Sequence, residues 1–328
     1  MGLKFSVALL IASFLVFFPA SGVFSKKRPA ARRKEEPQKI QKIRKKKGEK
    51  QAAKQKPAQK SFWERFVKDR NGSEEKLIQE ILVDLRSALN EEDQEKKEEL
   101  LKSAIGKAKK GTRLHPDSAD LHYWLGFGLY EVRRFKETLA AFKKAEKLDP
   151  EAGFIADMAF KKGIIYTVLG DYPKAVESYM TAARSPMQSA ESLGIIYSNA
   201  AECLMGMGRM VDAIRMYERS LTVRPASNSQ ALWGLAVALD RDEQISKSVQ
   251  AARAAAKIDP KLESLTGPGV FFVPEGELHY YLGIAYQALG KPEKALVHWK
   301  SFLKALPESP WAYRAEDHIK VLENSNQR

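Results

Sequence analysis

The stretch that decides the fold reads LHYWLGFGLYEVRRFKETLAAFKKAEKLDP, from Leu121 to Pro150. This stretch is typical of two short helices. A small residue, Gly126, lies in the middle of the first helix, and Phe142 and Ala145 lie in the second helix, before the closing proline. The same pattern returns about every 35 residues up to Pro307, five times in all. A unit of this period cannot bury its apolar face alone, so the sequence predicts an all-α array in which neighbours stack on one another.

The recurring landmarks each have a physical reason. The small residue lets the two helices of one unit approach closely, and the large apolar residues fill the space between units. The closing proline cannot continue a helix and therefore ends the second one. The small residues are Gly126, Gly163, Ala201, Ala236 and Gly283, and the closing prolines are Pro150, Pro225, Pro260 and Pro307.

At these residues the chain resembles the tetratricopeptide (TPR) repeat family, whose unit is about 34 residues of helix–turn–helix. The resemblance covers roughly residues 118–308 and implies an α-α superhelix of about five repeats. The chain departs from the family pattern at Thr138 and Ser248, where alanine is usual, and at Glu243, where glycine is commoner.

We expect helices on both sides of this array. Residues 61–117 should form a degenerate repeat or N-terminal cap, with helices over Glu74–Leu89 and Gln94–Lys110. Residues 309–328 should add a C-terminal capping helix over Pro310–Leu322. Apolar residues recur at helical spacing in these segments, and a charged outer face suits terminal units.

The resemblance also implies a concave groove lined by the first helices. Eight residues are predicted to bind a partner there, most of them aromatic, with polar Ser198 and Glu202 interrupting the stripe. The alternative is that the rings pack against neighbouring helices as core. Since Phe160 and Ile164 replace basic and amide residues of the family's clamp for acidic tails, the sequence favours a ligand with apolar side chains. The eight residues are Tyr123, Phe127, Phe160, Ile164, Asn199, Trp233, Tyr280 and Ile284.

The segment Lys261–Gly276 breaks the period with a turn-forming Gly267-Pro-Gly and an apolar run, Val270, Phe271, Phe272 and Val273. Apolar insertions of this kind are often functional. This loop is expected to fold back into the groove or contact a partner, or else to plug the gap between the fourth and fifth repeats.

The charge of the chain is concentrated in one segment. Residues 26–60 hold sixteen Lys or Arg against three Glu, so they carry +13 of the net charge of +14. They contain no aromatic residue and only Ile40 and Ile43 as large aliphatics, which predicts a disordered linker. The segment either binds an anionic membrane or cell-wall polymer, or serves as a solvated spacer. Binding of nucleic acid is disfavoured, because the segment has no aromatic side chain between its basic residues on which bases could stack.

Residues 1–25 are expected to be a signal peptide or signal anchor. An uncharged run from Phe5 to Phe18 follows Lys4, and Ala20 and Gly22 suit cleavage after Gly22. An uncleaved anchor over residues 5–25 is the alternative. The basic segment that follows would favour a cytoplasmic location of the repeats, but the cleavage-like residues favour export and a periplasmic or secreted location.

No constellation of residues indicates catalysis. The histidines have no metal-ligand spacing, no glycine loop cradles a phosphate, and the lone Cys203 is expected to pack as a small apolar residue. We therefore expect neither an enzyme nor a cofactor. The sequence predicts a protein–protein interaction scaffold of a bacterial-type cell envelope that binds a peptide or helix.

Overall fold

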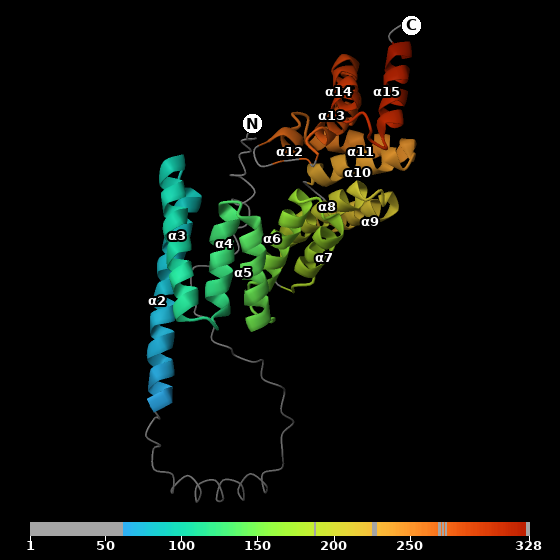
Figure 1. Ribbon diagram of the computed structural model, residues 1–328. Coiled ribbons are helices and arrows are strands. Elements are labelled where there is room, and N and C mark those ends of the chain that lie inside the picture. The colour runs from blue at the N-terminus through green and yellow to red at the C-terminus, as the bar shows by residue number, and fades with distance from the viewer. Residues whose placement is uncertain are drawn as a thin grey trace, which may run out of the picture.

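The computed structural model describes residues 62–186, 188–224, 228–267, 270, 272 and 274–325. Over these residues the chain is all-helical: fourteen helices and no strand, arranged as helix pairs that follow one another along a curved array (Figure 1). This confirms the predicted α-α superhelix. None of the described helices has both the length and the apolar character to cross a membrane.

The first half of the array contains α2 (Phe62–Asn90), α3 (Gln94–Leu114), α4 (Ala119–Glu131), α5 (Phe135–Leu148), α6 (Ile155–Val168) and α7 (Tyr172–Ala183). The second half contains α8 (Ala190–Gly206), α9 (Met210–Val223), α10 (Ser229–Arg241), α11 (Ile245–Ile258), α12 (Glu263–Thr266), α13 (Glu277–Ala288), α14 (Pro292–Ala305) and α15 (Ala312–Ser325).

The two helices of each repeat are joined by a turn that needs a left-handed residue. Gly170, Gly208 and Gly290 fill this position with φ between 67° and 74°. Arg133 and Glu243 take the same conformation with φ of 60° and 59°, although a side chain there is strained. The departure at Glu243 therefore leaves the turn geometry unchanged.

Three of the five predicted small residues, Gly126, Gly163 and Gly283, lie against a ring from the second helix of their own repeat. A Cβ added to Gly126 would lie 2.4 Å from the ring of Phe142, and one added to Gly283 would lie 2.5 Å from the ring of Trp299. Both rings belong to the second helix of the same repeat. Each ring thus packs on bare backbone, which fixes the spacing of the pair.

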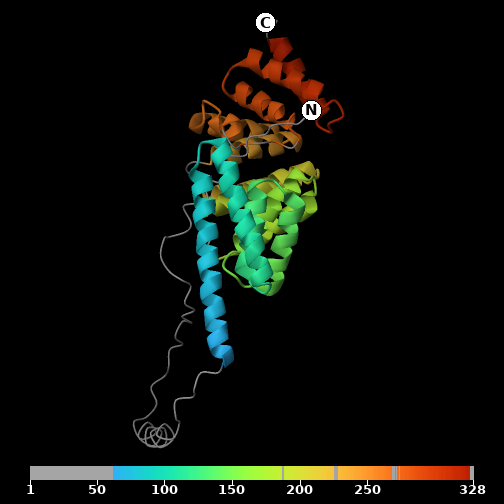
Figure 2. The ribbon, with the colours of Figure 1, turned by 60° about the vertical axis from the view of Figure 1, so that its left-hand side comes forward.

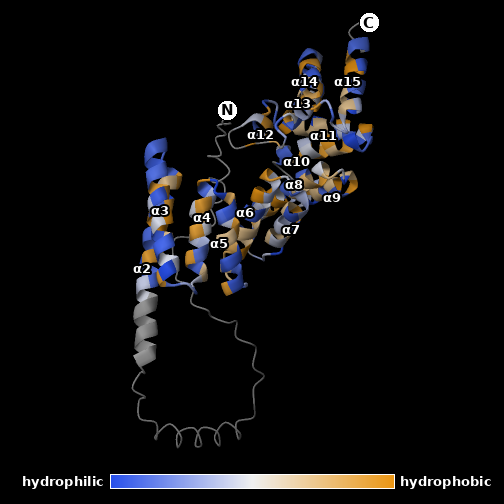
Figure 3. Cartoon of the chain, viewed as in Figure 1, coloured by the Kyte–Doolittle hydropathy of each residue, from blue (hydrophilic) through white to orange (hydrophobic). Residues whose placement is uncertain are grey.

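The helices of each pair are amphipathic, and their apolar sides meet along the array. Apolar and polar residues alternate along the helices in Figure 3. One continuous apolar cluster runs from α8 to α15, and smaller clusters cover α2–α4, α4–α6 and α4–α8. The core is therefore shared between neighbours, as stacking of units that cannot fold alone requires.

The terminal helices are present but longer than expected. The first begins at Phe62 rather than Glu74, and it runs past the end of α3 (Figure 2). Asp93 caps α3 by accepting from the backbone N–H groups of Glu95 and Lys96, which places the turn where the sequence predicted it. The predicted linker and leader, residues 1–60, lie outside the described residues.

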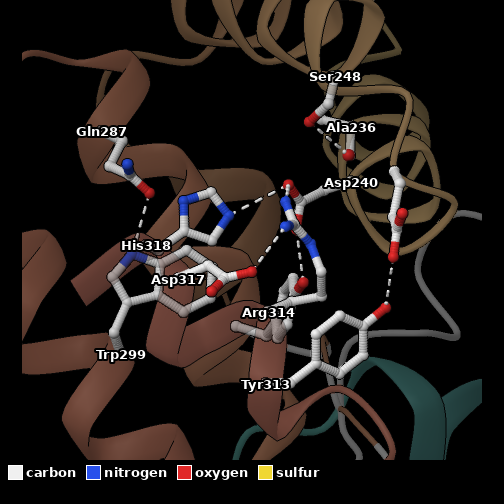
Figure 4. Close-up of polar contacts among 11 residues, drawn as sticks. Ala236, Asp240, Ser248, Gln287, Trp299, Tyr313, Arg314, Asp317 and His318 are labelled. Carbon is white, nitrogen blue, oxygen red and sulfur yellow. Dashed lines mark hydrogen bonds and ion pairs between the residues drawn. The ribbon is translucent and has the colours of Figure 1, made fainter. Parts of the chain in front are cut away.

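The last helix, α15, is fixed to the array where the half-buried side chains of Arg314 and His318 meet the buried carboxylate of Asp240. Arg314 Nη2 donates to Asp240 Oδ1 at 2.8 Å, and His318 Nε2 lies 3.1 Å from the same oxygen. Figure 4 shows both side chains pointing at Asp240, with the His318 ring stacked on Trp299 at 4.4 Å between ring centroids. The cap is thus held by charge as well as by apolar contact.

Candidate functional site

Most of the eight predicted groove residues are buried. Phe127 and Asn199 are partly exposed, whereas the other six have exposed fractions of 6% or less. These six are Tyr123, Phe160, Ile164, Trp233, Tyr280 and Ile284. Side chains at this depth offer little surface to a partner, so the array lacks an exposed aromatic stripe at these positions.

The buried rings fill the space between successive helices. Tyr123 stacks on Phe154 at 4.5 Å, and its hydroxyl donates to Asp157 at 2.6 Å. Tyr280 packs edge-on against Trp299 at 4.8 Å and donates to Asp240. The sequence analysis considered such packing of the rings in the core as the alternative to partner binding. That these residues bind a partner stays a prediction.

A cavity of about 960 Å³ lies between the middle of the array and its C-terminal end. We call it the concave cavity. Side chains from α6, α7, α8, α10 and α13 line one part, and the insertion loop and the α14–α15 turn line the other. Its apolar lining includes Ile164, Ile195, Met205, Met207, Leu265, Val270, Phe272, Leu306 and Trp311, and its polar lining includes Asn199, Glu202, Gln230, Arg241, Glu277, Tyr281 and Glu308.

The insertion loop forms a wall of this cavity. Val270 and Phe272 line it, and the Phe272 ring lies 4.8 Å from that of Tyr281. Phe272 also packs against the main apolar cluster. The three roles considered for the loop, in the groove, at a partner or as a plug between repeats, stay predictions. Phe271 and Val273, predicted to share this role, lie outside the described residues.

A short helix anchors the start of the insertion. Asp259 accepts from the backbone N–H groups of Glu263 and Ser264 and from the Ser264 hydroxyl, so it caps α12. Leu262 precedes that helix in a left-handed conformation, φ 62°, and is 3% exposed. A buried leucine in this strained conformation is held by the surrounding packing, which fixes the direction in which the loop leaves α11.

Glu202 occupies the floor of the cavity on α8. Its Oε1 accepts hydrogen bonds from Tyr217 on α9 at 2.5 Å and from Tyr281 on α13 at 2.7 Å. Burial raises the pKa of Glu202, while the two tyrosine hydroxyls and the Arg241 charge act in the opposite direction. The carboxylate therefore joins the third repeat to the fifth at the cavity.

Arg241 lies beside it and is 5% exposed. Its Nη2 donates to Glu277, and its guanidinium lies over the rings of Tyr280 at 4.4 Å and Trp311 at 5.4 Å. Its Nε is buried without a hydrogen-bond partner among the described residues. The arginine is thus committed to packing and to Glu277.

The described lining of the cavity includes one thiol, that of Cys203. Burial raises the pKa of the Cys203 thiol to about 12, so it stays protonated at neutral pH. It packs as a small apolar residue, as predicted. Within the described ranges, no three histidine, cysteine, aspartate or glutamate side chains come close enough together to hold a metal ion.

The sequence indicated Glu202 only as a polar interruption of the aromatic stripe, and it did not indicate the hydrogen-bond partners of Glu202. Tyr281 adjoins the predicted position Tyr280, and Arg241 ends α10, the helix that carries Trp233. A signal was present, since acidic and tyrosine residues recur on the first helices. Which tyrosine meets which carboxylate depends on the curvature of the array, which local patterns do not give.

Two segments match models of the tetratricopeptide repeat, residues 200–263 and residues 277–309. These matches support TPR repeats in the C-terminal half of the array. The chain is also similar to an uncharacterized TPR repeat-containing protein of Arabidopsis thaliana, with 31% identity over 125 residues. The aligned part is 35% of this chain and 14% of that protein, so the chain spans a small part of its relative.

Solved structures show similarity at low identity. PilF of Pseudomonas aeruginosa is 15% identical, with a TM-score of 0.49 over 76% of this chain and 99% of that one. MamA of Desulfovibrio magneticus RS-1 is 13% identical, with a TM-score of 0.47 over 58% of this chain and 97% of that one.

Proposed function

We propose that this protein is a non-catalytic scaffold that binds a peptide segment of a protein partner in the concave cavity. One observation carries the proposal: residues from seven helices, the insertion loop and the α14–α15 turn line a single space of about 960 Å³. Binding sites are commonly concave spaces of this size with a mostly apolar lining and a few placed polar groups. TPR repeats in the chain agree with a role in recognition rather than catalysis.

The cavity is lined by irregular loops as well as by the regular helix pairs of the repeats. Val270 and Phe272 come from a loop that interrupts the period, and Leu306 and Trp311 come from the turn before α15. Because both loops lie outside the regular helix pairs, the array can keep its stacking while these loops shape the site. Recognition residues are often placed in this way, on loops carried by a rigid scaffold.

The test blocks the cavity without adding charge. In Val270→Trp the indole would occupy the space beside Phe272, and in the matched control Val297→Trp it would lie on α14, where Val297 is 62% exposed. Selection of random nine-residue peptides by display should enrich binders on the wild-type chain and the control but not on Val270→Trp. Equal enrichment on all three would refute binding in the cavity.

The setting we propose is the cell envelope, on the support of the apolar run from Phe5 to Phe18 and the small residues that follow. A reporter active only outside the cytoplasm, fused after Arg328, should be active, and mass spectrometry should find a mature N-terminus at Val23. An intact Met1 with an active reporter would instead support an anchor over residues 5–25. A silent reporter would refute export.

A second candidate function rests on the +13 charge of residues 26–60. In this alternative the basic segment binds an anionic membrane or wall polymer, and the repeats act as a spacer or assembly module. Deletion of residues 26–60 should then abolish binding to vesicles that contain anionic lipid at low salt. Unchanged binding after the deletion would exclude it.

A further inference from the structure

We propose that the concave cavity selects a partner segment through a lysine or arginine side chain, whose charge pairs with Glu202. This inference rests on the proposed function, since it names the chemistry of the peptide that the cavity takes. Three observations support it: the charge balance of the lining, the free oxygen of Glu202, and the apolar path that leads to it.

The described lining of the cavity has an excess of negative charge. Its charged side chains are Glu202, Arg241, Glu277 and Glu308, and no lysine is among them. Arg241 pairs with Glu277 and its charge also acts on Glu202, so the described lining holds three acidic side chains against one basic side chain. A cationic side chain would balance part of this excess, whereas an acidic one would add to it.

Glu202 has one oxygen occupied and one available. Both tyrosine hydroxyls donate to Oε1, and over the described chain Oε2 accepts no hydrogen bond. Glu202 is half-buried and belongs to the cavity lining, so a side chain that enters the cavity can approach its carboxylate. The two tyrosines hold the carboxylate in place, which prepares Oε2 to accept from an incoming N–H group.

The walls around Glu202 suit the aliphatic stem of a basic side chain. Ile195 contributes apolar surface from α8, and Phe272 contributes it from the insertion. Long basic side chains place their methylene groups on such surface and direct the charge to a polar group. An acidic ligand has no matching site, because the Arg241 guanidinium is paired with Glu277 and its Nε is buried.

The experiment extends the peptide display selection to Glu202→Gln, with Glu293→Gln on the exposed surface of α14 as the matched control. Wild type and control should enrich peptides that share a lysine or arginine. Glu202→Gln should lose that enrichment, and changing the shared basic residue to norleucine should weaken binding to wild type about tenfold but to Glu202→Gln less than twofold.

The outcomes separate this inference from the proposed function. No enrichment above Val270→Trp would refute peptide binding itself. Enriched peptides without a basic residue, or an equal norleucine effect on wild type and Glu202→Gln, would overturn the inference and leave peptide binding intact. If Glu202→Gln fails to fold by circular dichroism, Glu308→Gln replaces it. Glu308 is exposed in the α14–α15 turn, and about a twofold loss is expected.

Discussion

Replacing Asp240 by asparagine should loosen the C-terminal helix while leaving the rest of the array folded. Asp240 is 1% exposed, and it accepts from Arg314 at 2.8 Å, His318 at 3.1 Å and Tyr280 at 2.5 Å. Burial alone would raise the pKa of Asp240, but the contacts with these three residues outweigh burial, and the pKa lies below its usual value. The carboxylate is therefore charged at neutral pH and supports two side chains of α15.

The expected loss follows from what remains after the substitution. Arg314 has a side chain that is 12% exposed, and its remaining partner, Asp317, is 3.3 Å away and half exposed. Removing one partner of a buried ion pair typically costs about 3–5 kcal/mol. Since Asp317 compensates in part, we expect about 3 kcal/mol for Asp240→Asn. The stacking of His318 on Trp299 should also weaken, because His318 loses its acceptor.

The assay combines urea denaturation with hydrogen exchange read by mass spectrometry. Asp240→Asn should lose about 3 kcal/mol, with lost protection concentrated in α15. Asp212→Asn is the control, because Asp212 forms an exposed pair with Arg209 and should lose about 0.5 kcal/mol or less. A double variant, Asp240→Asn with Arg314→Leu, should recover part of the loss, since no buried charge is left unpaired.

Two results would refute this reasoning. A loss below about 1 kcal/mol with unchanged protection of α15 would mean that Asp240 does not hold the helix. Equal losses for Asp240→Asn and Asp212→Asn would mean that burial of the pair does not matter. The effect should also shrink in acid, because a carboxylate with a depressed pKa loses its stabilising effect as pH falls through that pKa.

Three further predictions concern the repeats themselves. Gly283→Ala would place a Cβ 2.5 Å from the Trp299 ring and should lower the free energy of unfolding by about 1–3 kcal/mol, measured by thermal denaturation. Arg133→Gly should raise it by about 1 kcal/mol, because φ is 60° there; a loss would contradict the strain. For Glu131, burial raises the pKa to about 7, so stability should fall as pH rises from about 4.5 to 7. In urea titrations at several pH values, Glu131→Gln should remove this fall in the free energy of unfolding, which is about 3 kcal/mol at most. A pH profile that is the same in wild type and Glu131→Gln would contradict the burial of the Glu131 charge.

The repeat pattern predicted the fold because each landmark acts locally. Gly126 and Gly283 were placed at the close approach of paired helices from their positions alone, and both lie there. The turn after Asn90 and the capping helix near Pro310 also followed from short-range patterns. These features depend on residues a few turns apart, which is the range over which hydrophobic spacing and breaker residues are informative.

The site was harder to predict because it depends on long-range geometry. Tyr281 reaches Glu202 across 79 positions, and Val270 and Phe272 reach the cavity from a loop with no repeat partner. The groove prediction started from the expectation that the first helices line a concave side, and it could not tell which of their side chains remain exposed. A ring such as that of Trp233 suits a groove or a core equally well in sequence, and the neighbouring helix makes it core at 1% exposure.

The polar contacts of the inner helices share one arrangement, in which a buried tyrosine hydroxyl donates to a carboxylate of another helix. Tyr123 donates to Asp157 in the next repeat, Tyr280 to Asp240 in the preceding one, and Tyr281 to Glu202 two repeats away. In a stacked array each interface sets a small rotation, and these rotations add up to its curvature. Bonds that reach to other repeats therefore fix the curvature that encloses the concave cavity. Glu202 joins the third repeat to the fifth through Tyr281 and also lines the cavity. In the proposal above, the carboxylate that stabilises the curvature is therefore the one that binds the ligand.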